Sequence, residues 1–282
     1  MSEKMPLTLS SWSLGDQCRW EERVRAAKLA GFQGIGLRAE SYVDAKGEGL
    51  SDQDLLDILS RYDMKVTEVE YIVQWAEERR SYEQQYKEQI CFHMCRLFGV
   101  SHVNCGLMEH YPVEHTGKKL RELCGRAGDG IVIGVEPMPY SGIPDIHTAW
   151  AVVQSSGAPN AALILDTWHW VRAGHANDGA LLDGIPKEKI VSIQINDVHD
   201  RPYAASVLRD ESMHDRLAPG TGFGDTAGFL RMIREKGIKP RTIGVEVISD
   251  AILARGVTEA AAYLYGCTVP ILREVWPEAC ET

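Results

Sequence analysis

Short runs of large apolar residues recur along the chain, separated by longer amphipathic segments. Several runs are almost continuously hydrophobic, which is typical of parallel strands buried on both faces. The segments between them repeat apolar residues at helical spacing, as in RWEERVRAAKLAGF and DTAGFLRMIREKGI. The pattern predicts eight strands, over residues 7–14, 34–40, 65–72, 102–107, 131–138, 162–170, 190–197 and 242–249.

The regular alternation of strands and helices predicts the fold. Eight strand–helix repeats with short connections are typical of a (β/α)8 TIM barrel, an α/β fold with parallel strands. A doubly wound open sheet is the alternative, but no G-x-G-x-x-G motif follows the first strand. No linker, low-complexity tract or change of composition divides the 282 residues. We therefore expect a single domain over residues 1–282, with a kink or break at Pro270 in the closing helix.

Composition and charge narrow the classes of partner. A net charge of −10 argues against the broad basic surface that nucleic-acid binding needs. No apolar run approaches the roughly 20 residues of a membrane-spanning helix, and no opening stretch has the basic and apolar regions of a signal peptide. The seven cysteines are scattered in mostly apolar segments, which is typical of reduced thiols. These features predict a cytoplasmic protein without nucleic-acid or membrane partners.

Four late strands carry an oxygen-bearing side chain at or near their carboxyl ends. These residues are Glu136, Asp166, Gln194 and Glu246, each within or after an apolar run. The carboxyl ends of barrel strands meet at one mouth, where the active sites of this fold lie. Buried carboxylates are costly and repel one another unless a cation lies among them. Because three carboxylates and one amide oxygen are hard ligands, the sequence predicts one divalent ion, Mn²⁺ or Mg²⁺ ahead of Zn²⁺ or Co²⁺.

Each of these residues also has a purely structural interpretation. An acid at a strand end is often the N-cap of the next helix, and Asp197 could cap its loop in the same way. His169, which lies between two tryptophans in ALILDTWHW, could be a packed histidine bonded to a carbonyl. Recurrence on four consecutive strands favours the metal site, because independent caps do not readily produce such a set.

The motifs GVEPMP, LILDTWHW, IQIND and APGTG followed by IGVEV resemble the xylose isomerase-like TIM barrel family of sugar isomerases, epimerases and related enzymes. The resemblance covers nearly the whole chain and is strongest over residues 134–246. It implies that Glu136, Asp166, Gln194 and Glu246 hold one divalent metal and that His169 touches the substrate. Many members carry histidine where this chain has Gln194, whereas members resembling hydroxypyruvate isomerase and some dehydroshikimate dehydratases carry glutamine.

The two glutamates suit proton transfer next to a carbonyl. Either Glu136 or Glu246 is expected to remove the proton, and the other, or His169, to return one. The metal is expected to stabilise the charge that develops on the enediolate oxygens. The predicted function is therefore a metal-dependent isomerase or epimerase that acts on a small sugar or keto-polyol.

Further residues are expected to contact this polyhydroxy carbonyl substrate. The resemblance places Arg216, in MHDRLAPGTG, over the mouth, where His214 assists it. Trp12 and Trp168 offer flat walls for a sugar ring, although packing between barrel and helices explains either of them equally well. Glu70, at the end of its predicted strand, is a further candidate.

Three other functions compete with the isomerase. A lyase resembling 3-dehydroshikimate dehydratase, or one acting on a larger natural product, uses the same first proton abstraction. An abasic-site endonuclease shares the barrel but needs more histidines and a basic groove, which the net charge of −10 opposes. A barrel that binds a sugar without turnover is the non-enzymatic alternative. By analogy with the family, we expect a homodimer or a homotetramer.

Overall fold

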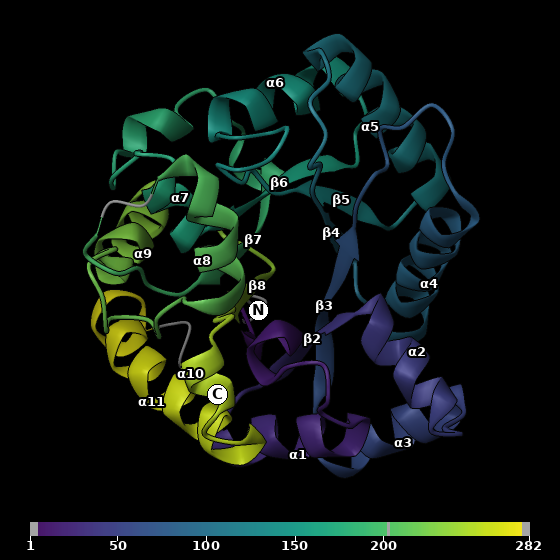
Figure 1. Ribbon diagram of the computed structural model, residues 1–282, viewed down its shortest axis with the longest axis vertical. Coiled ribbons are helices and arrows are strands. Elements are labelled where there is room, and N and C mark those ends of the chain that lie inside the picture. Colours follow the sequence, from purple (N-terminus) through teal and green to yellow (C-terminus); the bar gives the residue numbers. More distant parts are fainter. Residues whose placement is uncertain (1–4, 202–203, 278–282) are drawn as a thin grey trace.

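The chain folds into a closed barrel of eight parallel strands, each paired with its neighbours in the sequence. The structure is a computed structural model that describes residues 5–201 and 204–277. Figure 1 shows the barrel in the centre and the helices as an outer ring. The predicted (β/α)8 fold is thus confirmed. The strands are β1 (Leu7–Leu9), β2 (Gly34–Arg38), β3 (Lys65–Ile72), β4 (His102–Cys105), β5 (Val132–Val135), β6 (Ala161–Asp166), β7 (Ile190–Ile195) and β8 (Thr242–Val245).

Helices connect successive strands and cover the outside of the barrel (Figure 1). Capping boxes begin two of them: Ser51 and Asp54 bond reciprocally at the start of α3, and Ser81 and Gln84 do so at α4. The α-helices are α1 (Trp20–Ala30), α2 (Ala39–Gly47), α3 (Asp52–Arg61), α4 (Tyr82–Phe98), α5 (Val113–Ala127), α6 (Ile146–Ser156), α7 (Thr167–Arg172), α8 (Leu208–His214), α9 (Thr226–Glu235), α10 (Asp250–Leu253) and α11 (Val257–Val275).

Seven of the eight strands end earlier than predicted, and in two of them a polar side chain at the strand end caps a helix. We expected one strand over residues 7–14, but the Ser10 side chain accepts from the Trp12 backbone and a 3-10 helix, η1, follows (Ser11–Leu14). We expected another over 162–170, but Asp166 accepts from the backbone of His169 and caps α7. Both strands therefore turn into helix at the barrel mouth.

Pro270 does not break the closing helix, so the expectation of a break there was wrong. Helix α11 is assigned continuously through it. Pro270 cannot donate to the carbonyl of Gly266, four residues earlier. Both residues lie on the exposed side of the helix, so solvent can reach that carbonyl and reduce the cost of the missing bond.

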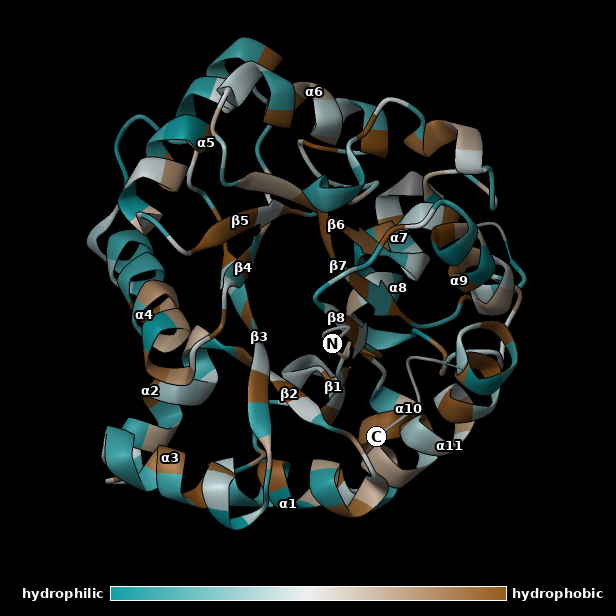
Figure 2. Cartoon of the chain, turned by 180° about the vertical axis from the view of Figure 1, so that it is seen from behind, coloured by the Kyte–Doolittle hydropathy of each residue, from teal (hydrophilic) through white to brown (hydrophobic). Residues whose placement is uncertain are grey.

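The main hydrophobic core lies between the strands and the helices (Figure 2), whereas much of the barrel interior is polar. Because side chains alternate along a strand, every second residue points inward. Near the amino-terminal ends, the Thr8 hydroxyl bonds to the hydroxyls of Thr67 and Thr242. Deeper toward the mouth, Glu68 accepts from Asn104. The polar side chains at the mouth thus continue a polar column.

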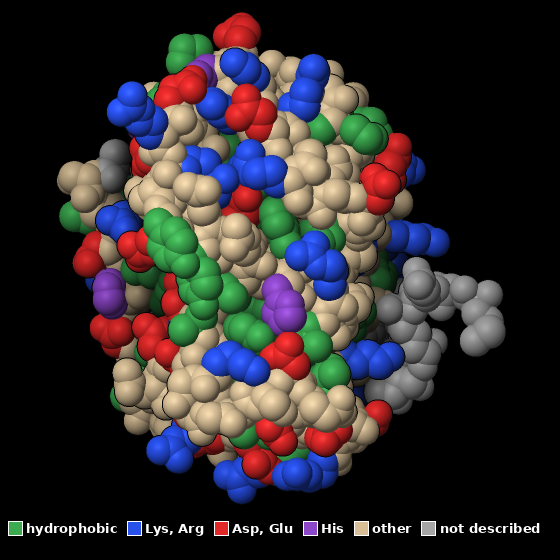
Figure 3. Space-filling model, turned by 90° about the vertical axis from the view of Figure 1, so that its right-hand side faces the viewer, with side chains coloured by type: hydrophobic (Ala, Val, Ile, Leu, Met, Phe, Trp, Pro, Cys, Tyr) green, Lys and Arg blue, Asp and Glu red, His purple; other side chains and the backbone are tan. Residues whose placement is uncertain are grey.

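The outer surface carries mixed charge. Figure 3 shows acidic and basic side chains interspersed over one side of the molecule, with a few hydrophobic side chains between them. Two exposed tyrosines of α4, Tyr82 and Tyr86, stack with ring centroids 6.1 Å apart. Within residues 5–201 and 204–277, no helix combines the length and hydrophobicity needed to cross a bilayer.

Candidate metal centre and active site

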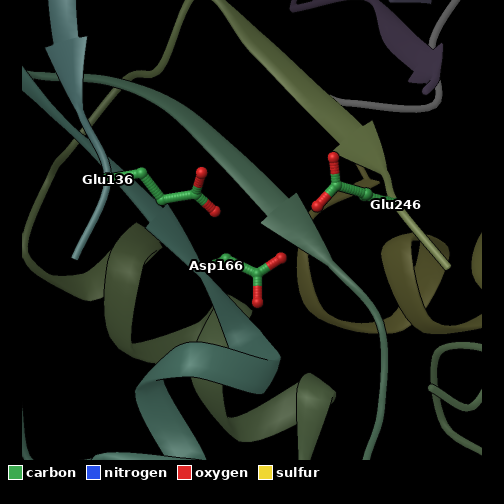
Figure 4. Close-up of side chains that lie close together, drawn as sticks. All are labelled: Glu136, Asp166 and Glu246. Atoms are coloured by element: carbon green, nitrogen blue, oxygen red, sulfur yellow. The ribbon is translucent and has the colours of Figure 1, made fainter. Parts of the chain in front are cut away.

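Three carboxylates from different strands meet inside the barrel mouth. Glu136 follows β5, Asp166 ends β6 and Glu246 follows β8. One oxygen from each lies within 4.8 Å of the other two, and Figure 4 shows the three side chains pointing toward one another. The structure thus brings together all three predicted acidic ligands, and each is at most 4% exposed.

The strand register explains why these side chains converge. The Glu136 backbone donates to the Cys105 carbonyl at 2.9 Å, and the Glu246 backbone donates to the Ile195 carbonyl at 3.2 Å. Both residues therefore continue the sheet pairing one step beyond the assigned strands, and their side chains keep the inward alternation. Asp166 pairs in register with Gln194 on β7, so the amide joins the same level of the barrel.

Burial makes this cluster electrostatically demanding. It raises the pKa of both Glu136 and Glu246 well above the usual value, and the other carboxylates raise it further. The pKa of Asp166 is also raised by burial, although nearby Arg216 opposes the shift. Arg216 Nη1 donates to Asp166 at 3.0 Å and to Glu246 at 3.1 Å. When all three acids are ionised, one guanidinium balances one of three negative charges, so the cluster then accommodates further positive charge.

Gln194 and Glu136 present buried oxygens that fit a divalent ion. The Gln194 amide nitrogen donates to Glu246 at 3.1 Å and to Glu70 at 3.4 Å. The amide is therefore oriented with its N–H groups, rather than its oxygen, facing these two carboxyl groups. Among the described residues, neither Gln194 Oε1 nor Glu136 Oε1 has a hydrogen-bond partner. Unpaired buried oxygens among carboxylates match the hard ligand set of Mn²⁺ or Mg²⁺.

Asp166 is held by groups outside the acidic cluster. Asn196 Nδ2 donates to Asp166 Oδ2 at 2.7 Å, and the backbone of His169 donates to Asp166 Oδ1 at 3.0 Å. Asp166 is therefore both an N-cap and a member of the cluster, so the two interpretations of this residue are compatible. Hydrogen bonds of this kind orient metal ligands and tune their affinity.

His169 faces the acids. It is 3% exposed, and its Nε2 lies 3.4 Å from Glu136 Oε1 and 3.5 Å from Arg216 Nη2. Burial, reinforced by the positive charge of Arg216, lowers its pKa well below the usual value, so the imidazole is neutral. No carbonyl in the described residues accepts from its Nδ1, which is buried without a partner. The packed-histidine alternative therefore lacks its expected carbonyl bond.

The structure separates the two residues expected from the loop after β7. Arg216 is 2% exposed and enters the acidic cluster, and its guanidinium also donates to the Ser212 carbonyl at 2.8 Å and the Ser212 hydroxyl at 2.9 Å. His214 is more than half exposed, and its Nδ1 lies 3.3 Å from Asp250 Oδ1. Arg216 is therefore part of the cluster, and His214 lies outside it.

The remaining predicted contact residues line or support the mouth. Trp168 is fully buried, and its ring packs 5.7 Å from the Arg216 guanidinium. The ring of Trp12 stacks under Arg38 at 3.9 Å. Glu70 is 1% exposed and accepts from Ser10 at 3.1 Å, besides its bond from Gln194. Glu70 thus packs against the Gln194 amide inside the barrel and is not exposed at the mouth.

The loop after β7 is fastened by Asp197. Its carboxylate accepts from the backbone of Val198, Gly222 and Gly224, at 2.8, 3.0 and 2.6 Å. The backbone of Asp197 also exchanges two bonds with Leu217, next to Arg216. The capping interpretation of Asp197 is therefore correct, and the cap fixes the segment that delivers Arg216.

Sequence reasoning missed two groups at the mouth. The Ser10 hydroxyl donates to Glu70 at 3.1 Å and lies 3.3 Å from Glu246. The Tyr71 hydroxyl donates to Met138 Sδ at 3.7 Å, and Tyr71 lowers the pKa of the Glu136 carboxyl, against the effect of burial. Ser10 follows the apolar run of β1, so the strand-end argument applied to Glu136 could have found it. Tyr71 falls on the outward phase of β3, and no sequence signal marks it.

Comparisons with known proteins agree with this fold. A model of the xylose isomerase-like TIM barrel family matches residues 24–267. A xylose isomerase-like TIM barrel/4-hydroxyphenylpyruvate dioxygenase fusion protein superposes with a TM-score of 0.82 at 21% identity, covering 96% of this chain and 43% of the other. The IOLI protein with a zinc atom also gives a TM-score of 0.82, at 19% identity over 96% of this chain and 99% of its own.

A curated relative matches part of the sequence. The 3-dehydroshikimate dehydratase of Pseudomonas aeruginosa is 31% identical over 137 residues, which cover 48% of this chain. The match covers only 21% of that relative's length, so the two proteins differ greatly in extent. The family model, by contrast, matches most of the chain, with the acidic cluster inside the matched range. The chain therefore belongs to the xylose isomerase-like TIM barrel family.

Proposed function

We propose that this protein is a divalent-metal-dependent isomerase or epimerase that removes a proton next to the carbonyl of a small polyhydroxylated substrate. The observation that carries the proposal is the buried cluster of Glu136, Asp166 and Glu246, whose oxygens lie within 4.8 Å of one another. Arg216 pairs with two of these acids, Asp166 and Glu246. A site with excess buried carboxylates, next to a neutral histidine, suits proton transfer better than passive sugar binding.

Four side chains would hold the ion: Glu136, Asp166, Gln194 and Glu246. The ion, when bound, would act as a Lewis acid for the carbonyl and hydroxyl oxygens of the substrate. Mn²⁺ or Mg²⁺ fits three carboxylates and an amide best, and Zn²⁺ or Co²⁺ is the alternative. The IOLI structure with its zinc atom supports a metal in this fold.

The two glutamates have different surroundings, and we assign them different roles. Glu246 accepts from Gln194 and Arg216, so donors hold both of its oxygens. Glu136 keeps one oxygen without a donor, which makes it the freer base. Glu136 removes the proton next to the carbonyl, and Glu246 returns it from the other side of the site.

His169 and Arg216 recognise the substrate oxygens. The neutral imidazole of His169 lies 3.4 Å from Glu136, where it donates to or accepts from a hydroxyl without adding charge. Arg216 presents further N–H donors to a hydroxyl or carboxylate group. Proton return to the neighbouring carbon gives an isomerase, and return to the opposite face of the same carbon gives an epimerase.

A second candidate is a dehydratase, which the curated relatives favour. Both the Pseudomonas aeruginosa and the Pseudomonas putida relatives are named 3-dehydroshikimate dehydratase, at 31% and 28% identity over about half of this chain. The same proton removal by Glu136, followed by loss of a β-hydroxyl as water, would complete that reaction. The two candidates share the base and differ in the product.

The test is solvent exchange in deuterated water. Purified protein with Mn²⁺ or Mg²⁺ is incubated with a panel of ketoses and cyclic keto-acids, and the products are identified by NMR and mass spectrometry. Deuterium on the carbon next to the carbonyl, in an isomer or epimer, is the expected result. Loss of water to a conjugated enone indicates the dehydratase. No exchange, with metal and sugar bound, indicates a non-catalytic barrel and contradicts both.

A matched pair of variants controls this test. Glu136→Gln should abolish exchange, because an amide cannot accept the proton. Glu259→Gln makes the same change at a side chain that is 69% exposed on α11, and it should exchange like the wild type.

A further inference from the structure

Ser212, a fully buried residue of α8, holds Arg216 at two points. Arg216 Nε donates to the Ser212 carbonyl at 2.8 Å, and Nη2 donates to the Ser212 hydroxyl at 2.9 Å. Nη1 donates to Asp166 and Glu246, at 3.0 and 3.1 Å. Because a guanidinium is planar and rigid, the two bonds to the serine on one edge fix how the opposite edge meets the carboxylates.

One N–H of Arg216 has a weaker partner. Nη2 lies 3.5 Å from His169 Nε2, which is longer than the bonds to Ser212 and to the two acids. A guanidinium has no acceptor, so the imidazole nitrogen accepts in this contact. A substrate oxygen that approaches His169 can therefore take over this N–H, while the shorter bonds keep the rest of the guanidinium in place.

Tyr140 holds the Ser212 hydroxyl from the other side. This tyrosine lies in the segment between β5 and α6, and its hydroxyl oxygen is 3.0 Å from Ser212 Oγ. A serine hydroxyl can accept from the guanidinium and still share a hydrogen bond with the phenol. The ring of Tyr140 packs edge-on against His169, with ring centroids 5.6 Å apart. The phenol thus connects the serine to the histidine that faces Arg216.

Helix α8 is anchored at the residue before Ser212. Glu211 is 2% exposed, and both of its carboxylate oxygens accept from Arg172 of α7. The ring of Trp168, also on α7, lies 5.9 Å from the Arg172 guanidinium and 5.7 Å from that of Arg216. The paired charges therefore fix α8 against α7, and with it the Ser212 carbonyl and hydroxyl.

We propose that Ser212, supported by Tyr140, is a positioning residue for Arg216. It sets the guanidinium so that Nη1 stays on Asp166 and Glu246 while one N–H of Nη2 faces the substrate side of the mouth. The inference rests on the proposed function, because substrate recognition is assigned to Arg216 there. The claim about the guanidinium itself is measurable without any substrate.

Ser212→Ala tests the hydroxyl, with Ser156→Ala as the matched control. Ser156 is also fully buried, and its hydroxyl donates to the Val153 carbonyl at the far end of α6. Nitrogen-15 exchange NMR of the full chain with Mg²⁺ measures rotation about the Nε–Cζ bond of Arg216, whose signals are identified by their loss in Arg216→Lys. Rotation should be at least about tenfold faster in Ser212→Ala, because a charge-assisted bond is lost, and unchanged in Ser156→Ala.

Substrate kinetics test whether the serine acts through the arginine. With the substrate identified by deuterium exchange, Ser212→Ala should raise KM about tenfold and lower kcat less than about threefold, because Glu136 is untouched. Lysine cannot form the two-point contact. In the Arg216→Lys background, Ser212→Ala should therefore raise KM less than about twofold further.

Several outcomes would overturn the proposal. Wild-type rotation of the guanidinium in Ser212→Ala would do so. An equal rise in KM in both backgrounds would also do so, because the serine would then act on the substrate by itself. If Ser212→Ala fails to fold, Tyr140→Phe replaces it, with rotation expected to be about threefold faster and an unchanged rate contradicting the proposal. If no substrate shows exchange, the proposed function fails, whereas the rotation rate still decides the role of Ser212.

Discussion

At the level of single residues, the barrel mouth holds three carboxyl groups, and Arg216 pairs with two of them. Asp166 and Glu246 share Arg216, whereas Glu136 lies 3.4 Å from the neutral His169. The Gln194 amide adds an oxygen without adding charge. A histidine at this position would supply a nitrogen ligand instead, which is softer. In the proposed site, the glutamine would therefore keep the donor set all-oxygen, which would favour Mn²⁺ or Mg²⁺.

Gln194→Leu tests the contribution of the amide. The substitution removes one proposed ligand oxygen and the N–H groups that Glu246 and Glu70 accept. We expect Mn²⁺ affinity, measured by calorimetry on metal-stripped protein, to fall at least about tenfold. Gln53→Leu, at an exposed glutamine of α3, is the control and should bind Mn²⁺ like the wild type. Equal affinity in both variants would exclude Gln194 from the site.

At the level of elements, the loop after β7 depends on a single carboxylate. Asp197 accepts three backbone N–H groups that hold the loop, and this loop carries Arg216 into the mouth. Asp197→Ala leaves those donors without their partner, so we expect the free energy of unfolding to fall by roughly 2–4 kcal/mol. Denaturant unfolding measures this loss.

The control for this variant is Asp183→Ala. Asp183 pairs with Lys236 at 2.6 Å, but its side chain is 70% exposed, so its removal should cost less than about 1 kcal/mol. A similar small loss in Asp197→Ala would show that the loop does not depend on the buried carboxylate.

Strand periodicity was sufficient to predict the barrel and the four inward oxygens. In the alternating pattern of each strand, an inward-facing position after the apolar run carries one of these oxygens: Glu136, Asp166, Gln194 and Glu246. The closed sheet places the four residues at one level. Seven strand ends were misplaced, and those of β1 and β6 were misplaced because Ser10 and Asp166 cap helices that periodicity does not reveal.

Tyr71 could not be predicted from the sequence for a related reason. A register shift between β3 and β4 changes the direction of one side chain, and it arises from contacts between strands rather than from local pattern. The space beside Gly106, where a Cβ atom would lie 2.1 Å from the Tyr71 hydroxyl oxygen, is likewise visible only when β3 and β4 lie side by side.

At the level of the whole molecule, the polar column inside the barrel links stability to pH. Burial raises the pKa of Glu70 from 4.5 to about 8, and it raises the pKa of Glu136 and Glu246 well above 4.5. Between pH 4.5 and about pH 8, the folded state therefore binds more protons than the unfolded chain. Stability of the metal-free protein should fall as the pH rises from about 5 to 8, since the folded state resists deprotonation.

Thermal unfolding in a chelator at a series of pH values measures this effect. The melting temperature should decrease from pH 5 to pH 8 without metal, and saturating Mn²⁺ should raise it most at pH 8, where its ligands lose protons most readily. A melting temperature that rises over this range without metal would contradict the assignment of buried, protonated carboxyls.

Anomalous X-ray scattering from crystals grown with Mn²⁺ tests the central claim most directly. The account predicts one strong peak inside the barrel mouth, within about 2.0–2.6 Å of oxygens from Glu136, Asp166, Gln194 and Glu246. A mouth without such a peak, with the three acids paired only to protein groups, would contradict it.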